Sequence, residues 1–494
     1  MSVKKEIVHA PLYETLLGCH FQRNSSFHVP GHKGGRALPA QFKGMLEQVM
    51  SIDYTEITGL DDLHQPEGVI KEAQDLAADC FGADRTFFLV NGSTVGNLAM
   101  ITAVCGRGDI LIVQRNVHKS VIHGLMIAGA KAVFVAPQSD PETGLAAGIS
   151  NKDLVEALDR YPQAKAVFLT NPNYYGMAMD LEQTVRLVHS RGIPLLVDEA
   201  HGAHFGFHPE LPRSALSVGA DAVVQSSHKM LTALTMGAML HVRSTRIDPN
   251  QISGRLSMLQ SSSPSYPIMA SLDLSRSMLQ SKGSELFTPG LQCVKELRQH
   301  ILSLDVFGVV SGHKNEVYAA LDPFKITLWD RIGTLSGFDL QQQLEQRGCM
   351  TEMADPRHVL LLFSLASEPR DVNHLLSALL DINDKLGLKE KENPLALANN
   401  RVAPPMPPIS QPIPFDLDHS LLLDHVRTLP LEETAGFRSA EMVIPYPPGI
   451  PVLYPGEPIL KETTDYLQVL AATGARFQGI SDRKLSTLKV VKDH

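Results

Sequence analysis

A carboxylate and an amine each follow a short apolar segment in the middle of the chain. The apolar residues 193–197 lead into Asp198, and the apolar residues 222–224 lead into a polar segment that contains Lys229. A lysine can hold an aldehyde as a Schiff base, and an aspartate can keep a pyridine nitrogen protonated. The pair therefore predicts a pyridoxal 5'-phosphate site in which the ring acts as an electron sink.

Polar residues surround both members of the pair. Ser226 and His228 flank Lys229 with hydrogen-bonding groups, and His201 follows Asp198 closely enough to reach the same cofactor. A lysine that is buried against such groups loses its proton more readily, as Schiff-base chemistry requires. Taken singly, an aspartate is more often a helix cap and a lysine more often a surface residue. Their shared position at the ends of apolar segments favours the site.

The elements that would bring the pair together are parallel strands. Short apolar segments that read as strands alternate with helical patterns: strands are expected at 86–90, 109–114, 131–136, 166–170, 193–197 and 222–224, and helices at 69–81, 95–105, 150–160 and 180–192. Such alternation predicts βαβ units and a doubly wound sheet. The carboxyl ends of parallel strands share one crevice, where ligands bind.

A phosphate cradle is predicted before the helix at 95–105. Ser93 and Thr94 stand between an expected strand and this helix, next to a glycine. Free amide groups at a helix start attract anions, and two hydroxyls can add hydrogen bonds. Serine and threonine also cap helices for structural reasons alone, so the motif gains its weight from Lys229, which needs a phosphate-bearing partner.

Histidines offer further candidates with structural alternatives. His118 follows the expected strand at 109–114, where an imidazole could lie flat on a cofactor ring or serve a purely structural role. The loop 30–35 (PGHKGG) is either a surface turn or a site-lining loop. His201, His204 and His208 have spacing that invites a metal, but glycine and proline interrupt any helix and no further ligands complete a shell, so no metal is predicted.

Composition narrows the class of protein. The chain has 494 residues, is 44% hydrophobic and carries a net charge of −9, which is typical of a globular protein and gives no basic footprint for nucleic acid. Its five cysteines are scattered, without a CxxC pair. No apolar leader and no run of eighteen apolar residues is present. We expect a cytoplasmic protein without a membrane partner.

Changes in composition suggest four regions. Residues 1–284 form an N-terminal segment and a large domain, and residues 285–388 have the pattern of a smaller α+β domain. Residues 389–415 shift to charges and then prolines, which indicates a semi-rigid linker. Residues 416–494 form a C-terminal domain.

Six segments, in order along nearly the whole chain, resemble the bacterial ornithine/lysine/arginine decarboxylases in their short form without an N-terminal wing domain. They are PGHKGG (30–35), NGST (91–94), RNVHKS (115–120), DEAH (198–201), QSSHK (225–229) and the segment 446–457. The resemblance implies an α/β fold: an aspartate-aminotransferase-like (fold type I) large domain with a mostly parallel sheet, a smaller α+β domain and a C-terminal α+β segment.

The resemblance also implies roles for residues. Lys229 would carry the pyridoxal phosphate, Asp198 would pair with its pyridine nitrogen, and His118 and the Ala200 methyl would cover the two ring faces. Ser93, Thr94, Ser226 and His228 would bind the phosphate. Ser261 would reach the partner subunit of a homodimer or higher homo-oligomer with a shared active site, and Glu457 would hold the substrate. This chain has Ser261 where some relatives have threonine and His201 where some have tryptophan, which bears on substrate preference.

The activity implied is decarboxylation of lysine, ornithine or arginine, a small-molecule substrate, to the corresponding diamine or agmatine. The acid that returns a proton to the substrate would be Lys229 or His228. Two alternatives stay open: another fold type I enzyme, such as an aminotransferase or a β-eliminating lyase, and a non-catalytic protein that binds pyridoxal phosphate. The complete set of Lys229, Asp198 and His118 disfavours the second.

Overall fold

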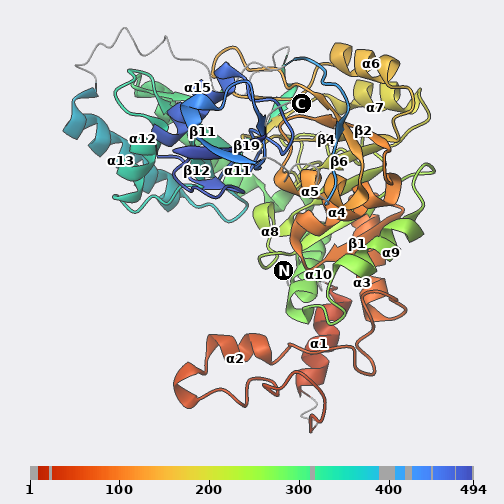
Figure 1. Ribbon diagram of the computed structural model, residues 1–494. Helices are drawn as coiled ribbons and strands as arrows, with labels where there is room; N and C mark the ends of the chain where they lie inside the picture. Colours follow the sequence, from red (N-terminus) through yellow and green to blue (C-terminus); the bar gives the residue numbers. More distant parts are fainter. Residues whose placement is uncertain are drawn as a thin grey trace. The chain divides into compact units, whose positions relative to one another are not determined.

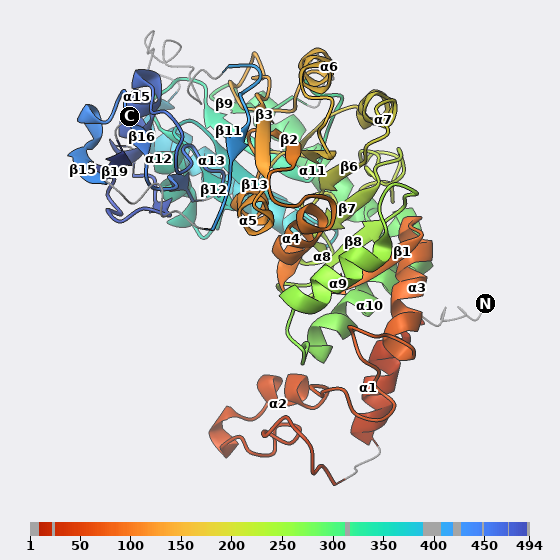
Figure 2. The ribbon, with the colours of Figure 1, turned by 45° about the vertical axis from the view of Figure 1, so that its right-hand side comes forward.

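The structure is a computed structural model that describes residues 9–21, 25–311, 317–388, 407–417, 426–446, 449–472 and 474–491 (Figures 1 and 2). Its residues fall into two units. Unit 1 comprises Met1–Gly106, Lys165–Asn171 and Leu181–Leu286, and unit 2 comprises Arg107–Ala164, Pro172–Asp180 and Phe287–His494. The domain boundaries expected above stay a prediction, and each unit is described by itself.

Unit 1 contains five neighbouring strands in the order β1-β8-β7-β6-β4. They are β1 (Arg85–Leu89), β4 (Ala166–Thr170), β6 (Leu195–Asp198), β7 (Ala222–Gln225) and β8 (Ala238–Val242). The pairs β4–β6 and β6–β7 are parallel. β6 and β7 are buried along their whole length, which explains why their sequences are continuously apolar rather than alternating.

One strand of unit 1 runs against the others. β8 is antiparallel to both β7 and β1. The connection between β7 and β8, residues 226–237, contains only the short helix α8 (Ser227–Met230). A crossover to a parallel strand usually contains a helix that packs on the sheet, and this helix of four residues is too short for that role. Lys229 lies on this short connection.

The helices of unit 1 include the expected helix 69–81, which the structure confirms as α3. The full set is α1 (Pro11–Phe21), α2 (Met45–Met50), α3 (Val69–Phe81), α4 (Gly92–Val104), α7 (Leu181–His189), α8, α9 (Pro249–Leu259) and α10 (Tyr266–Lys282), with 3₁₀ turns η1 (Ala40–Phe42) and η2 (Gly283–Leu286). α4 packs against α9 and the sheet. The helix α1 begins at Pro11, and residues 1–8 lie outside the described residues.

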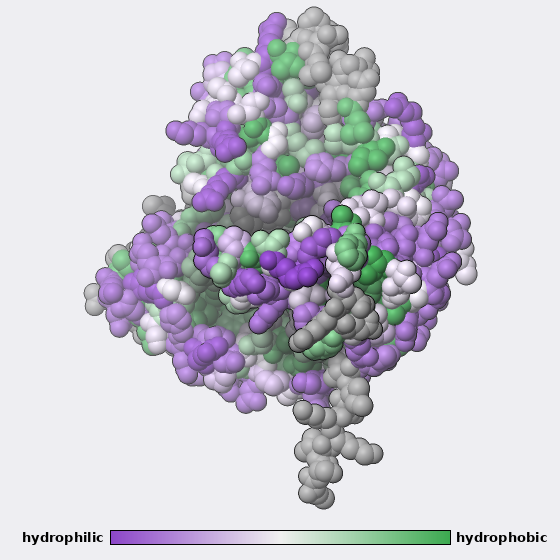
Figure 3. Space-filling view, turned by 90° about the horizontal axis from the view of Figure 1, so that it is seen from below, coloured by the Kyte–Doolittle hydropathy of each residue, from purple (hydrophilic) through white to green (hydrophobic). Residues whose placement is uncertain are grey.

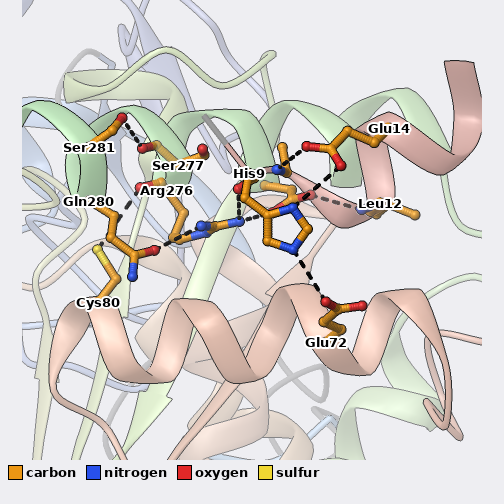
Figure 4. Close-up of polar contacts among 11 residues, drawn as sticks. His9, Leu12, Glu14, Glu72, Cys80, Arg276, Ser277, Gln280 and Ser281 are labelled. Carbon is orange, nitrogen blue, oxygen red and sulfur yellow. Dashed lines mark hydrogen bonds and ion pairs between the residues drawn. The ribbon is translucent and has the colours of Figure 1, made fainter. Parts of the chain in front are cut away.

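The buried Arg276 of α10 helps to hold the residues at the start of α1 (Figure 4). Asp273 pairs with Arg276 and accepts a hydrogen bond from the Leu12 backbone N–H at 3.0 Å. Arg276 also donates to the His9 carbonyl at 3.0 Å and to Gln280 Oε1 at 2.9 Å. Burial leaves these charges no solvent, so their mutual pairing fixes the start of α1.

Apolar side chains are exposed in the segment between α1 and α3. They are Phe27, Val29, Phe42, Met45, Leu46 and Val49. The face seen in Figure 3 shows apolar atoms among hydrophilic ones. No described helix is long and apolar enough to cross a bilayer.

Unit 2 contains several small sheets. The parallel pair β2 (Ile110–Gln114) and β3 (Lys131–Val135) is extended by β14 (Ile413–Pro414), antiparallel to β3. A four-stranded antiparallel sheet has the order β12-β13-β11-β9, and β15, β19 and β16 form a third sheet. The remaining strand pairs are β10–β5 and β17–β18.

Unit 2 contains both strands and helices within residues 287–388, where an α+β pattern is expected. Its further strands are β5 (Met177–Ala178), β9 (Phe307–Val309), β10 (Ala320–Leu321), β11 (Lys325–Asp330), β12 (Met353–Ala354), β13 (Val359–Leu362), β15 (Arg427–Pro430), β16 (Arg438–Ser439), β17 (Ile444–Pro445), β18 (Phe477–Gln478) and β19 (Thr487–Val491). Its helices are α5 (Lys119–Ala128), α6 (Asn151–Arg160), α11 (Thr288–Ser303), α12 (Gly337–Glu345), α13 (Pro369–Leu386) and α15 (Lys461–Ala472), with the 3₁₀ turn η4 (Leu431–Glu433).

The proline-rich stretch contributes to a sheet where the structure describes it. Residues 407–415 of the expected linker include β14, and an isolated bridge joins Ile409 to Val135. Phe415 is buried. Residues 389–406 of the expected linker lie outside the described residues.

Candidate active site

The start of α4 presents the expected phosphate cradle within unit 1. Gly92 has φ 74°, a left-handed conformation that glycine adopts without strain, and its N–H donates to the Met236 carbonyl at 2.9 Å. Gly92 begins the helix α4 of 13 residues, and Ser93 and Thr94 are the next residues of its first turn. Backbone N–H groups of a first helical turn have no partner within the helix, so this end can receive an anion.

Close packing fixes the position of α4. A Cβ atom on Gly96 would lie 2.5 Å from Cγ2 of Val224 and 2.9 Å from Cδ1 of Leu89. Glycine therefore allows α4 to approach β7 and β1 more closely than any other residue would. The side chains one turn apart on α4, Ser93 and Asn97, are held over the end of the sheet as a result.

Asp198 is buried at the end of β6 and is held by two donors. Asn97 Nδ2 donates to Oδ2 at 2.8 Å, and the Ala200 backbone N–H donates to Oδ1 at 3.0 Å. Burial raises the pKa of Asp198, while the hydrogen bond from Asn97 and the charge of Lys229 act in the opposite direction. The two donors stabilise the carboxylate form of Asp198. This is the form that a cationic ring nitrogen would need beside it.

Lys229 and His201, which were expected to share the cofactor, are in contact. Nζ of Lys229 lies 3.0 Å from Nε2 of His201. Both are largely removed from solvent, and Lys229 follows β7, the parallel neighbour of the strand β6 that ends at Asp198. The structure thus brings together Asp198, His201 and Lys229 in unit 1.

Ser226 carries a buried hydroxyl that lacks a partner. It is 0% exposed, and its Oγ makes no hydrogen bond to any residue that the structure describes. An unsatisfied buried hydroxyl costs free energy unless a ligand supplies the missing contact. Ser226 and the start of α4 therefore fit the phosphate group of a cofactor.

His228 is oriented by a backbone carbonyl. Its Nδ1 lies 3.1 Å from the Gly237 oxygen, which assigns the proton of the neutral ring to Nδ1. Burial lowers the pKa of His228, and the charge of Lys229 lowers it further. In this state Nε2 is an acceptor, so the expected phosphate contact requires a second proton on the ring.

Two further expected residues lie in unit 1 without a direct test of their roles. Ala200 is buried directly after Asp198 and Glu199. Ser261 is exposed, its carbonyl accepts from His64 Nε2 at 2.8 Å, and its hydroxyl accepts from the Ser263 N–H at 3.3 Å. The contact of Ser261 with a partner subunit stays a prediction.

His118 belongs to unit 2, where it caps a helix. Its Nδ1 accepts a hydrogen bond from the Ser120 backbone N–H at 3.2 Å and lies 2.8 Å from Ser120 Oγ at the start of α5. A Cβ on Gly449 would lie 3.2 Å from the His118 ring. The structural role considered for His118 is therefore present, and its stacking role stays a prediction.

Glu457, expected to hold the substrate, is engaged by an arginine of unit 2. Both carboxylate oxygens accept from Arg115 Nη2, at 3.1 and 3.0 Å, and Oε2 also accepts from the Tyr454 N–H at 2.9 Å. Arg115 is buried and donates further to the carbonyls of Pro451 and Val452 and to the Tyr454 hydroxyl. A substrate cation would have to compete with Arg115 for the Glu457 carboxylate.

We expect Glu457→Ala to destabilise the protein. Removing one partner of a buried ion pair costs about 3–5 kcal/mol, because the other charge is left without compensation. The measurement is the midpoint of urea unfolding, with the exposed Glu432→Ala as a control. An unchanged midpoint together with a raised KM would instead favour the substrate-binding role.

Two residues that sequence reasoning did not single out organise these sites. Asn97 orients Asp198, and its position four residues after Ser93 on one helix was an available signal. Arg115 stands at the head of the segment 115–120, but its partners are more than 330 positions away. No local pattern reveals such a contact.

Solved structures define the fold class. Over 98% of this chain, lysine decarboxylase A from Pseudomonas aeruginosa aligns with a TM-score of 0.83 at 24% identity, covering 81% of that chain. The lysine decarboxylase LdcF of Francisella novicida aligns with a TM-score of 0.82 at 22% identity, covering 98% and 81%. The predicted α/β fold of the aspartate-aminotransferase-like (fold type I) class is confirmed.

Sequence comparison defines the family. The model of the Orn/Lys/Arg decarboxylase major domain matches residues 10–317, and that of the C-terminal domain matches residues 407–484. The chain belongs to the Orn/Lys/Arg decarboxylase family. It is 36% identical to an arginine decarboxylase of Bacillus subtilis over 98% of both chains, and 42% identical to the uncharacterized protein YaaO of the same organism over 96% of both. The expected family and the expected class of enzyme, a carboxy-lyase, are confirmed.

Proposed function

We propose that this chain is a pyridoxal phosphate-dependent decarboxylase that converts a basic amino acid to a diamine or agmatine and carbon dioxide. The observation that carries the proposal is the contact network of unit 1. Asp198 lies at the end of β6, and Lys229 lies just after the neighbouring strand β7. The unpartnered Ser226 hydroxyl and the start of α4 supply a phosphate site beside them.

The cofactor, when bound, supplies an aldehyde for the substrate amine and a ring that accepts the electrons released with carbon dioxide. Asp198 holds a negative charge where the ring nitrogen would stand, and Asn97 and Ala200 keep its oxygens in place. Lys229 would hold the aldehyde of the cofactor through its side-chain amine.

Lys229 is the better of the two candidates for returning a proton to the substrate Cα. The lowered pKa of His228 leaves that ring neutral near pH 7, with its one proton directed at the Gly237 carbonyl. A lysine released from the aldehyde carries protons on a flexible stem. His228 then has no proton available for the substrate, so it is not the acid.

Arginine is the first substrate to test. Relatives at 36% identity are named arginine decarboxylases, from Bacillus subtilis and Bacillus anthracis, whereas lysine decarboxylase LdcA of Pseudomonas aeruginosa is 27% identical. A guanidinium group also offers a planar set of donors that a carboxylate can bind in two places.

The experiment is a panel of arginine, lysine and ornithine with the purified holoenzyme, in which carbon dioxide and the amine product are measured together. The proposal predicts equal amounts of carbon dioxide and amine from at least one substrate. Formation of a keto acid without carbon dioxide would indicate an aminotransferase or an eliminating lyase. Cofactor binding without consumption of any amino acid would indicate a non-catalytic protein.

We also propose that the enzyme acts in the cytoplasm as a homodimer or a higher homo-oligomer. The exposed apolar side chains between α1 and α3 support this, because an apolar patch on one chain is commonly covered by another. Sedimentation of the holoenzyme at the mass of a single chain would contradict it.

A further inference from the structure

Glu199, the residue after Asp198, is a buried carboxyl that the proposed reaction does not use. It is 0% exposed, and it accepts three hydrogen bonds. The Ala215 N–H donates to Oε1 at 2.7 Å, and Ser214 Oγ and Gln225 Nε2 donate to Oε2 at 3.1 and 2.7 Å. Among the described residues, no lysine, arginine or histidine forms an ion pair with it.

The contacts of Glu199 continue as a polar chain across the sheet. Gln225 Oε1 lies 3.2 Å from His241 Nε2, and His241 Nδ1 lies 2.8 Å from Thr86 Oγ1. Burial lowers the pKa of His241 to about 3, so its ring is neutral. The Gln225 carbonyl therefore accepts from Nε2–H, and Nδ1 accepts from the Thr86 hydroxyl. The chain crosses the neighbouring strands β1, β8, β7 and the end of β6.

This polar chain lies on the face of the sheet opposite to Asp198. Successive side chains of a strand point to opposite faces, so Asp198 and Val224 face α4 whereas Glu199 and Gln225 face away. The close approach of Gly96 on α4 to Val224 agrees with this assignment. The Glu199–Gln225 hydrogen bond thus joins the ends of β6 and β7 on the face away from α4. Its members are the chain neighbours of Asp198 and Ser226.

We propose that Glu199 is a positioning residue, which holds the ends of β6 and β7 together through Gln225 and so sets Asp198 and the Ser226–Lys229 segment at the spacing that one cofactor spans. This inference rests on the proposed function, because it concerns the same site. Each member of the chain touches its neighbour directly, so the link depends on hydrogen bonding and not on a net charge.

The hydrogen bond between Glu199 and Gln225 can persist when Glu199 becomes protonated. Burial raises the pKa of Glu199, the three donors lower it and the charge of Asp198 raises it, with a net pKa of about 8. A protonated Glu199 can donate to Gln225 if the Gln225 amide turns over, and His241 can then move its proton to Nδ1 and donate to Thr86. The chain of hydrogen bonds reverses direction without losing a member.

Because the hydrogen bonds can change direction, substitutions can distinguish a positioning role of Glu199 from an effect of its charge. Glu199→Gln keeps the shape and the link in its reversed direction, whereas Glu199→Ala and Gln225→Met each break it. Asp221→Asn is the matched control, since Asp221 is also buried and ties the opposite ends of β6 and β7, through the Leu195 N–H at 2.8 Å and through Ser244.

The measurement is the affinity of each protein, stripped of cofactor, for pyridoxal phosphate, followed by visible absorbance, alongside the unfolding midpoint. We expect binding about tenfold weaker in Glu199→Ala and Gln225→Met, which is the value of one hydrogen-bonded link. Glu199→Gln should stay within about twofold of the wild type, because its link is retained. Asp221→Asn should lower the midpoint and leave the affinity unchanged.

The possible results are distinct. If Glu199→Gln folds but binds as weakly as Glu199→Ala, the charge is what matters and the inference is overturned. Wild-type affinity in both link-breaking variants also overturns it while leaving the proposed function intact. A wild-type protein that binds no pyridoxal phosphate overturns the proposed function and this inference together. If Glu199→Ala does not fold, Gln225→Met carries the comparison alone, because Glu199 keeps its other two donors.

Discussion

Replacing Lys229 by alanine is expected to abolish turnover and the visible absorbance of the lysine-linked cofactor. The alanine side chain has no amine to bond the aldehyde or to return a proton, so two functions are lost at once. We expect the rate of carbon dioxide release to fall by about 10³-fold or more. The fold should persist, because Lys229 lies on the short α8 segment between two strands that are fixed by their own pairing.

The control for this variant is Lys152→Ala, which removes an exposed lysine of α6. It should retain both absorbance and turnover. Retention of both in Lys229→Ala would refute the assignment of this lysine, and with it the catalytic account of unit 1. Loss of absorbance with near-normal turnover would show that another amine performs the exchange.

Asp198→Asn is expected to keep the cofactor and lose most of the activity. The asparagine has nearly the same shape, but it no longer places a negative charge beside the ring nitrogen, so the protonated ring is disfavoured. We expect a fall in kcat of about 10²–10⁴-fold. One of the two donors to this side chain, Asn97 or the Ala200 N–H, would face an amide N–H₂, which implies a modest loss of stability as well.

Absorbance of the bound cofactor, circular dichroism and kcat, measured on the same preparation, separate these effects. The Asp221→Asn variant again serves as the comparison, because it alters a buried aspartate at the far ends of the same strands. Near-normal kcat in Asp198→Asn would remove the electron-sink argument, while loss of cofactor would show that Asp198 mainly anchors the ring.

Much of the fold could be predicted from the sequence, because its signals are local. The apolar periodicity of residues 69–81 gives α3, and the apolar segments before Asp198 and Gln225 give β6 and β7. The direction of β8 could not be read in the same way. The apolar pattern gives no strand prediction for residues 238–242, and the antiparallel direction of β8 follows from a connection that contains only the short α8.

The candidate site divides in the same manner. The proximity of Lys229, Asp198 and His201 could be predicted because residue type and strand-end position both point to them, while their roles stay a prediction. The partners of Glu457 could not, since Arg115 is 342 positions away in the chain. Glu199 was visible beside Asp198, yet its role depends on side chains from three other strands. Contacts between residues far apart in the chain produce no periodic pattern in the sequence.

The burial of Arg115 has a consequence for proteins that are truncated at the C-terminus. Its guanidinium rests over the Tyr454 ring and near Phe134, and its donors are met by groups from residues 451–457. A protein shortened after residue 406 would expose this cation in an apolar recess at the end of β2 and would leave the edge of β3 without β14. The C-terminal region is thus an integral part of unit 2 and does not form a separate domain. Its proteolytic removal should also unfold the β2–β3 region.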